Sequence, residues 1–172
     1  MRDLADKDAI ERFLTGLAAR VRGPGRVYLV GGATAVLNGW RDSTIDIDLK
    51  ADPEPPGFFE AIATLKDDLS VNVELASPDQ FLPELPGWRE RSLFITRHGE
   101  IDFYHFDPYS QALAKLERGH PRDLHDLAAF AASGQVQPTT LRELFQSIRD
   151  QLIRFPAVDA ATLAAKVEKW NL

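Results

Sequence analysis

The stretch LVGGATAVLNGWRDSTIDIDL, residues 29–49, decides the fold of this chain. It begins inside a short β-rich run, residues 27–30, that is typical of a buried strand. Gly31 and Gly32 end this run, and residues 33–40 have a helix-compatible composition. The sequence therefore predicts a strand, a tight glycine turn and a short helix in immediate succession.

A second strand follows at residues 44–50, where polar and apolar side chains alternate strictly. Asp46 and Asp48 fall on one face of this strand, with α-carbons about 6.5 to 7 Å apart. Two carboxylates at that spacing are able to share a divalent cation, because proteins usually hold Mg²⁺ with one or two carboxylates, substrate phosphates and water. The same alternation is also typical of a half-buried edge strand with an acidic wet face, so the pattern alone leaves both interpretations open.

The glycine turn is a candidate phosphate site. Glycines at a strand-to-helix junction let backbone amides approach a phosphate, and the start of the helix adds a favourable dipole. Thr34, two residues on, adds a hydroxyl. The turn is not a Walker loop, because no lysine follows at the required position, and it lacks the third glycine of a dinucleotide fingerprint. A Gly-Gly pair by itself is also a common tight connection.

The remainder of the chain supplies further elements around this centre. Hydrophobic spacing predicts helices over residues 4–21 and 58–65, strands over 71–75, 93–97 and 101–106, and helices throughout the part after residue 107. The sum is an α+β fold, a mixed sheet with flanking helices. We expect one domain over residues 1–132 and a helical extension over residues 133–172 packed on it.

The combination of these features resembles the signature of the nucleotidyltransferase superfamily that includes DNA polymerase beta. Thirteen residues separate the glycine pair from Asp46, and a later strand supplies a third carboxylate, Asp102, flanked by Ile101 and Phe103. The resemblance implies that the metal ions, Mg²⁺ or Mn²⁺, are held by Asp46, Asp48 and Asp102. In this scheme Asp46 and Asp48 hold the ion on the triphosphate, and Asp102 binds a second ion and helps to deprotonate the acceptor hydroxyl. The resemblance also implies that the phosphates of an NTP are cradled by Gly31, Gly32 and Thr34.

A closer resemblance is to the nucleotidyltransferase-like toxins of type IV toxin–antitoxin systems, and it covers about residues 27–132. It is carried by residues 29–49, by EIDFYHF at 100–106 and by KLERGHPRDLHDLAAF at 115–130. In relatives the last stretch has a Lys-Leu pair, a basic residue and two aspartates, which match Lys115, Leu116, Arg122, Asp123 and Asp126. Many of those toxins are longer, so the substrate-binding additions are expected to be reduced here.

The resemblance implies that Lys115 offsets charge on the leaving pyrophosphate and that Arg122 faces phosphate. Structural alternatives exist for each of these residues. Lys115 fits a surface lysine with a buried stem, and Arg122 fits an i,i+4 pair with Asp126. Asp123 fits a helix first turn, where a carboxylate is favoured by the helix dipole.

Composition and charge restrict the class of protein. The chain has 172 residues and no cysteine, which excludes disulfides and thiolate metal sites. The net charge of −6 is concentrated in residues 51–84, which have one basic and eight acidic side chains, so a phosphate-bearing partner remains compatible with the rest. The charged start and the absence of a long apolar stretch predict a cytoplasmic protein without a membrane span.

The resemblance therefore implies an enzyme that transfers NMP from an NTP to an RNA, protein or small-molecule acceptor, with an antitoxin protein as a further partner. Two alternatives stay open. One is a non-catalytic module that keeps the fold and binds a nucleotide or a protein. The other is a two-metal nuclease, which needs the carboxylates but neither the glycine turn nor an NTP.

Overall fold

The computed structural model describes residues 1–171, which group into two compact units. The first unit contains residues 1–77 and 92–105, and the second contains residues 78–91 and the part of the chain from residue 106 on. The domain boundary expected after residue 132 falls inside the second unit and stays a prediction.

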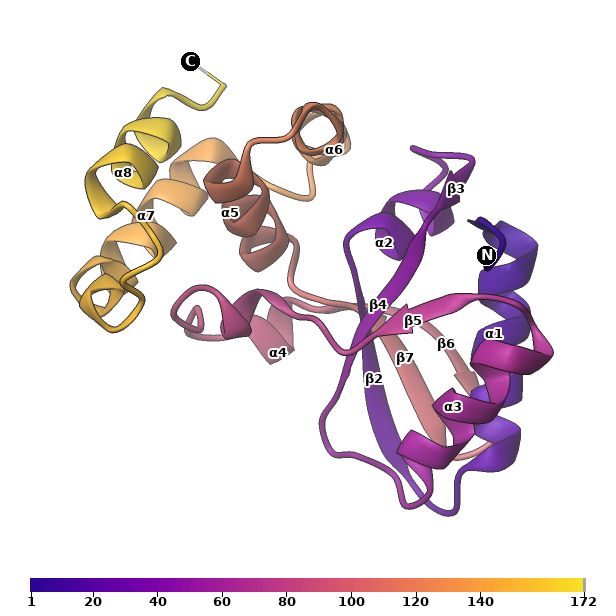
Figure 1. The fold of residues 1–172 in the computed structure, drawn as a ribbon. Coiled ribbons are helices and arrows are strands. Elements are labelled where there is room, and N and C mark those ends of the chain that lie inside the picture. The colour runs from indigo at the N-terminus through magenta and orange to yellow at the C-terminus, as the bar shows by residue number, and fades with distance from the viewer. Residues whose placement is uncertain (172) are drawn as a thin grey trace. The chain divides into compact units, whose positions relative to one another are not determined.

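The first unit is built on a five-stranded mixed sheet with the strand order β5-β4-β2-β7-β6 (Figure 1). Strand β2 runs parallel to β7 and antiparallel to β4, while β5 is parallel to β4 and β6 is antiparallel to β7. This arrangement confirms the predicted fold class. The strands are β2 (Gly25–Val30), β4 (Asp46–Ala51), β5 (Asn72–Glu74), β6 (Leu93–His98) and β7 (Ile101–His105).

Three helices of the first unit accompany this sheet, namely α1 (Lys7–Arg20), α2 (Gly32–Leu37) and α3 (Phe58–Asp68). The opening helix starts later than the hydrophobic spacing predicts. Two short strands, β1 (Ala5–Asp6) and β3 (Ser43–Thr44), pair with each other. Asp6 then caps α1 by accepting a hydrogen bond from the Ala9 backbone N–H at 2.8 Å, which satisfies a donor that the helix itself leaves unpaired.

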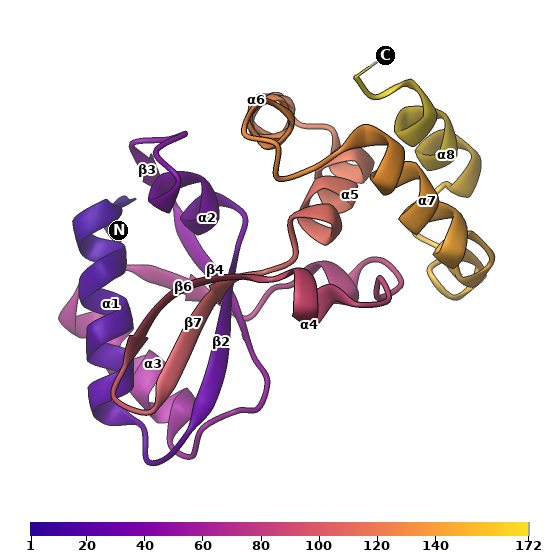
Figure 2. The ribbon, with the colours of Figure 1, turned by 180° about the vertical axis from the view of Figure 1, so that it is seen from behind.

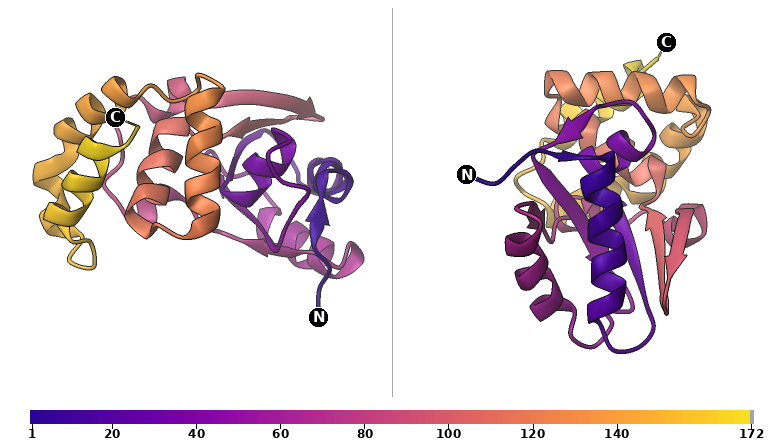
Figure 3. Two further views of the ribbon diagram at one scale, coloured as in Figure 1. Left: turned by 90° about the horizontal axis from the view of Figure 1, so that it is seen from above. Right: turned by 90° about the vertical axis from the view of Figure 1, so that its right-hand side faces the viewer.

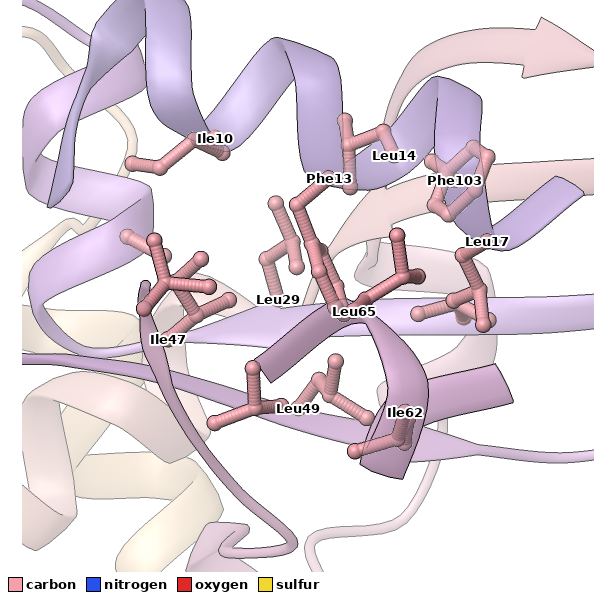
Figure 4. Close-up of a cluster of buried hydrophobic side chains, with 14 of the residues drawn as sticks. Ile10, Phe13, Leu14, Leu17, Leu29, Ile47, Leu49, Ile62, Leu65 and Phe103 are labelled. Atoms are coloured by element: carbon pink, nitrogen blue, oxygen red, sulfur yellow. The ribbon is translucent and has the colours of Figure 1, made fainter. Parts of the chain in front are cut away.

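The hydrophobic core of the first unit lies between the sheet and helices α1 and α3 (Figure 4). One stripe of α1 and the apolar alternate positions of the strands supply it, with Ile10, Phe13, Leu14 and Leu17 meeting Leu29, Ile47, Leu49 and Phe103.

We call the opposite side of the sheet the second face. By alternation it carries Arg26, Tyr28 and Val30 of β2, Asp46, Asp48 and Lys50 of β4, Asn72 and Glu74 of β5, and Asp102 and Tyr104 of β7.

The second unit is helical, and α5 packs against α4, α6, α7 and α8 (Figures 2 and 3). Its helices are α4 (Trp88–Arg91), α5 (Pro108–Arg118), α6 (Pro121–Ala132), α7 (Pro138–Ile148) and α8 (Ala160–Lys169), with 3-10 turns at Pro78–Gln80 and Arg149–Arg154. Over residues 1–171, none of the helices has the length and apolar character that a membrane span requires.

A buried carboxylate ties the two sequence segments of the second unit together. Asp107 caps α5, accepting from the Tyr109 backbone at 3.1 Å and from the Ser110 hydroxyl at 2.8 Å. Arg91, at the end of α4, donates to both carboxylate oxygens at 3.1 and 2.7 Å. Because a buried charge is costly unless it is paired and hydrogen-bonded, this contact fixes residues 78–91 to the segment that starts at residue 106.

Candidate active site

The candidate site lies at the end of the sheet where β2 stops and β4 starts. In the antiparallel pairing of these strands, Val30 lies opposite Asp48, so the glycine turn that follows Val30 adjoins the first residues of β4. Asp46 and Asp48 are both half-buried on the second face, while Ile47 between them is in the core. The structure therefore brings together the glycine turn and the carboxylate pair, as the spacing predicts.

The glycine turn has no room for side chains. Gly31 has φ +64° and ψ −125°, and a Cβ at this position would lie 3.3 Å from the Asp48 carboxylate oxygen Oδ2. A Cβ on Gly32 would lie 2.0 Å from the hydroxyl oxygen of Thr44, well inside van der Waals contact. Glycine at both positions therefore allows the Asp48 carboxylate and β3 to lie directly against the turn.

The other carboxylate of the pair is oriented by its neighbour in the sheet. Asn72 of β5 lies beside Asp46 in the parallel register and donates its side-chain amide to Asp46 Oδ1. Thr44 donates its hydroxyl to the backbone carbonyl of Asp46 at 3.0 Å. One position along, Glu74 lies beside Asp48 in the register. Sequence analysis did not identify Asn72 or Glu74, although their alternation with buried valines marks both for one face of a strand.

Thr34 takes part in the internal packing of the unit and is only 1% exposed. Its hydroxyl donates to the Leu29 carbonyl at 3.1 Å, so its oxygen accepts from Nδ1 of His105, also at 3.1 Å. Burial lowers the pKa of His105 to about 4, so the imidazole is neutral at neutral pH. The structure thus contradicts the expectation that Thr34 faces a phosphate, and it assigns the hydroxyl to holding the end of β7 near α2.

Asp102 is not brought to the other two carboxylates. It lies beside Arg26 at the start of β2, four residues before Val30, which is opposite Asp48. At about 3.3 Å per residue, that places it roughly 13 Å further down the sheet. Its carboxylate is 3.5 Å from the Arg97 guanidinium. The expectation of a centre shared by Asp46, Asp48 and Asp102 is therefore wrong for this geometry, although Asp102 is on the predicted face.

Lys115 lies in the second unit and is buried, with a side chain 5% exposed. Its ammonium nitrogen is 2.8 Å from Asp126 Oδ2 and 3.8 Å from Asp123 Oδ1. The Arg118 guanidinium donates to both oxygens of Asp123, at 2.8 and 2.6 Å. We call Lys115, Arg118, Asp123 and Asp126 the ion cluster. The sequence interpretations of Lys115, as a charge for the leaving pyrophosphate or as a surface lysine, did not include its ion pair with Asp126.

Neighbouring groups stabilise the negative charge of Asp123. Burial alone would raise the pKa of this carboxyl, but the hydrogen bonds and charge of Arg118, the His120 backbone N–H and the Lys115 ammonium outweigh burial and hold the pKa below its usual value. Asp123 accepts from the His120 N–H at 3.1 Å, which closes a capping box at the start of α6. Arg122 is exposed on the same helix, and its contact with a nucleotide stays a prediction.

The donors at the candidate site suit a hard divalent cation. Asp46 and Asp48 supply carboxylate oxygens on one face, and the absence of a side chain on Gly31 leaves the Asp48 oxygen at the turn. Across residues 1–171, no three histidine, aspartate or glutamate side chains are gathered closely enough to hold a metal ion by themselves. Mg²⁺ fits such a pair, because it commonly completes its coordination with water and substrate phosphates.

A mixed sheet with a strand, glycine turn and helix followed by an Asp-x-Asp strand defines the chain as a protein of nucleotidyltransferase fold. Residues 9–169 match the family described as "Nucleotidyltransferase of unknown function (DUF6036)", and the chain belongs to this family. No curated protein and no solved structure matches it.

Proposed function

We propose that this protein is a metal-dependent nucleotidyltransferase that moves NMP from an NTP to a hydroxyl group and releases pyrophosphate. The observation that carries the proposal is the position of Asp48, on the same strand face as Asp46, directly against a side-chain-free turn at one end of the sheet, in a chain of this family. The turn supplies backbone N–H groups for phosphate oxygens, and the pair supplies the ligands for Mg²⁺ or Mn²⁺.

In the proposed reaction, the acceptor oxygen forms a bond to the α-phosphorus of the NTP. The bond from that phosphorus to the oxygen bridging to the β-phosphorus breaks, pyrophosphate leaves with the electron pair, and the hydroxyl proton passes to water. A bound Mg²⁺ would neutralise charge on the phosphates. Asp46 would be held in position by Asn72, and Asp48 by its place against Gly31.

The first experiment is calorimetric titration of an NTP with and without Mg²⁺. The Asp46→Asn and Asp48→Asn variants should lose the metal-dependent gain in affinity. Asp8→Asn is the matched control, because this carboxylate is 77% exposed on α1 and pairs only across the helix surface with Arg12. The same NTP affinity with and without metal would refute the proposal.

The second experiment uses NTPs labelled at the α-phosphate with cellular RNA, protein or small molecules as acceptors. Transfer of label together with release of pyrophosphate is expected. A nuclease would instead shorten RNA without needing an NTP.

The resemblance to type IV toxins extends the proposal to a toxin role in the cytoplasm, controlled by an antitoxin. Co-purification of the protein with the product of an adjacent gene tests that extension.

A non-catalytic nucleotide-binding module is the second candidate function. The position of Asp102 favours it, because Asp102 lies beside Arg26, away from the pair, and across residues 1–171 no three carboxylate or histidine side chains are gathered to hold a metal ion. Such a module would bind an NTP in a metal-dependent manner and transfer no label with any acceptor.

A further inference from the structure

Three aromatic rings lie side by side on the second face of the sheet. Tyr28 of β2 and Tyr104 of β7 are register partners, and their rings stack with centroids 5.3 Å apart and planes at 23°. Phe94 of β6 lies opposite Tyr104, with ring centroids 5.7 Å apart and planes at 76°. We call these three residues the aromatic row.

The aromatic row is supported at its inner end and exposed at its outer end. Tyr28 is 1% exposed and shares its strand face with Arg26. Tyr104 is half-buried, and Phe94 is 60% exposed although it lies in a strand. An exposed ring held against a second, fixed ring presents a π-face and edge to a ligand at a small cost in conformational freedom.

Positive side chains lie on both sides of the aromatic row on the same face. Lys50 of β4 is the register partner of Tyr28. Arg26 and Arg97 lie one step further from the candidate site, on either side of Asp102. Arg97 is 59% exposed, and its guanidinium is 3.5 Å from the Asp102 carboxylate. A β-bulge between Phe94 and Thr96 places Phe94 and Arg97 on one face despite their odd spacing, opposite Tyr104 and Asp102 respectively.

The aromatic row also adjoins the candidate active site within the first unit. Asp48 and Lys50 are alternate residues of β4 and share a face, so the row that begins beside Lys50 starts about 7 Å from Asp48. Strands are spaced by about 4.8 Å, which puts Tyr104 roughly 10 Å and Phe94 roughly 14 Å to the side of β4. These distances from β4 suit a single-stranded nucleic acid of two or three nucleotides whose end lies near Asp48.

We propose that the aromatic row binds single-stranded nucleic acid, stacking its bases on Phe94 and Tyr104 while Arg26, Lys50 and Arg97 contact its phosphates. Aromatic stacking combined with backbone contacts by cations is the general mode of single-strand binding. A protein partner would use the exposed ring equally, but it would have no need of cations on both sides of it. This inference rests on the proposed function only in naming the bound strand as the acceptor; binding itself needs no transfer.

The test is fluorescence anisotropy of the full chain with labelled single-stranded RNA and DNA of about 12 nucleotides, a length within known single-strand site sizes, in EDTA so that no transfer takes place. Phe94→Ala should weaken binding about 5- to 150-fold, the range expected when one stacked base loses its ring. Phe94→Tyr keeps the ring and should restore affinity. Phe59→Ala is the matched control, because Phe59 on α3 is 53% exposed but lies away from the row. It should bind as the wild type does.

Loss of oligonucleotide binding in Phe94→Ala with recovery in Phe94→Tyr supports the proposal, whether or not label transfer is found. Label transfer without binding that depends on Phe94 overturns the proposal for the aromatic row and leaves the proposed function intact. Equal affinities for wild type and Phe94→Ala overturn it. So does failure to bind at roughly 100 μM, the weak end of non-specific nucleic-acid binding. Dimerisation that depends on Phe94, without binding to either oligonucleotide, would assign the ring to a protein interface and also overturn it.

Discussion

Lys115→Met tests whether Lys115 is a structural cation of the second unit or a free charge for the triphosphate. Methionine keeps most of the side-chain length and removes the ammonium, which leaves Asp126 buried, with a side chain 1% exposed, beside Asp123 at 0%. Removing one partner of a buried ion pair costs about 3 to 5 kcal/mol, and here both buried carboxylates lose the ammonium that lies near them. For a chain of this size, each kcal/mol lowers the melting temperature by about 2 to 4 °C, so a decrease of roughly 6 to 20 °C is expected.

The assay is thermal and urea unfolding followed by circular dichroism, with hydrogen exchange to show that α5 and α6 lose protection first. Lys7→Met is the matched control, because Lys7 and Glu11 form a surface pair at 3.9 Å with side chains more than half exposed. Such pairs contribute about 0 to 1 kcal/mol. The double variant Lys115→Met/Asp126→Leu should recover part of the loss, since an apolar pair replaces a desolvated ion pair.

A cost of less than 1 kcal/mol for Lys115→Met, close to that of Lys7→Met, would refute this reasoning. The ammonium would then not be committed to the ion cluster, and its predicted role toward the leaving pyrophosphate would gain support. If the cost is as expected, a loss of transfer activity in this variant reports unfolding of the second unit and cannot be assigned to catalysis.

Three further outcomes follow from the contacts described above. Burial lowers the pKa of His105 from 6.5 to about 4, so between these pH values the imidazole is protonated in the unfolded chain and neutral in the folded chain. The free energy of unfolding should therefore fall by about 3 kcal/mol between pH 7 and 4. Urea titrations of His105→Gln should show a free energy of unfolding that depends less on pH over this range. The lowered pKa of Asp123 affects stability at lower pH. The ionised carboxylate contributes its full stabilisation above the unfolded-state pKa of about 3.9, and this stabilisation is lost as the pH falls through the folded-state pKa. Acid titration of Asp123→Asn, followed by circular dichroism, should therefore lack this loss of stability. Gly32→Ala should destabilise the first unit by about 1 to 3 kcal/mol in thermal unfolding, because its new Cβ would overlap Thr44; unchanged stability would show that β3 is able to move away.

The sequence was sufficient to predict the parts of the site that depend on neighbours in the chain. Alternation at Asp46 and Asp48 identifies their shared face, and the glycine pair identifies the turn beside them, because both are local consequences of strand geometry. The same alternation correctly puts Asp102 on the second face. Its level along the sheet is set by the pairing of β7 with β2, which no local pattern of β7 encodes.

The ion cluster and the supporting residues were less accessible to sequence analysis. Lys115 pairs with a carboxylate eleven residues away, across the turn between α5 and α6, and an isolated lysine on a helix has the same local pattern whether it is paired or solvated. Asn72 and His105 acquire their roles from strands and helices distant in the chain. Such contacts follow from tertiary packing, which overrides what each segment favours by itself.

The interleaving of the two units constrains how this protein can be divided or assembled. The chain passes from one unit to the other three times, after residues 77, 91 and 105, so no single cut yields either unit whole. A gene truncated after residue 105 would still encode residues 78–91, with Trp88 deprived of its stacking partner Phe106 and Arg91 of Asp107. End-to-end fusion of two separate genes gives one crossing between units, and insertion of one whole unit inside the other gives two, so neither event by itself produces this order of segments. A minimal version of the sheet unit must therefore be made by joining residue 77 to residue 92 with a short linker.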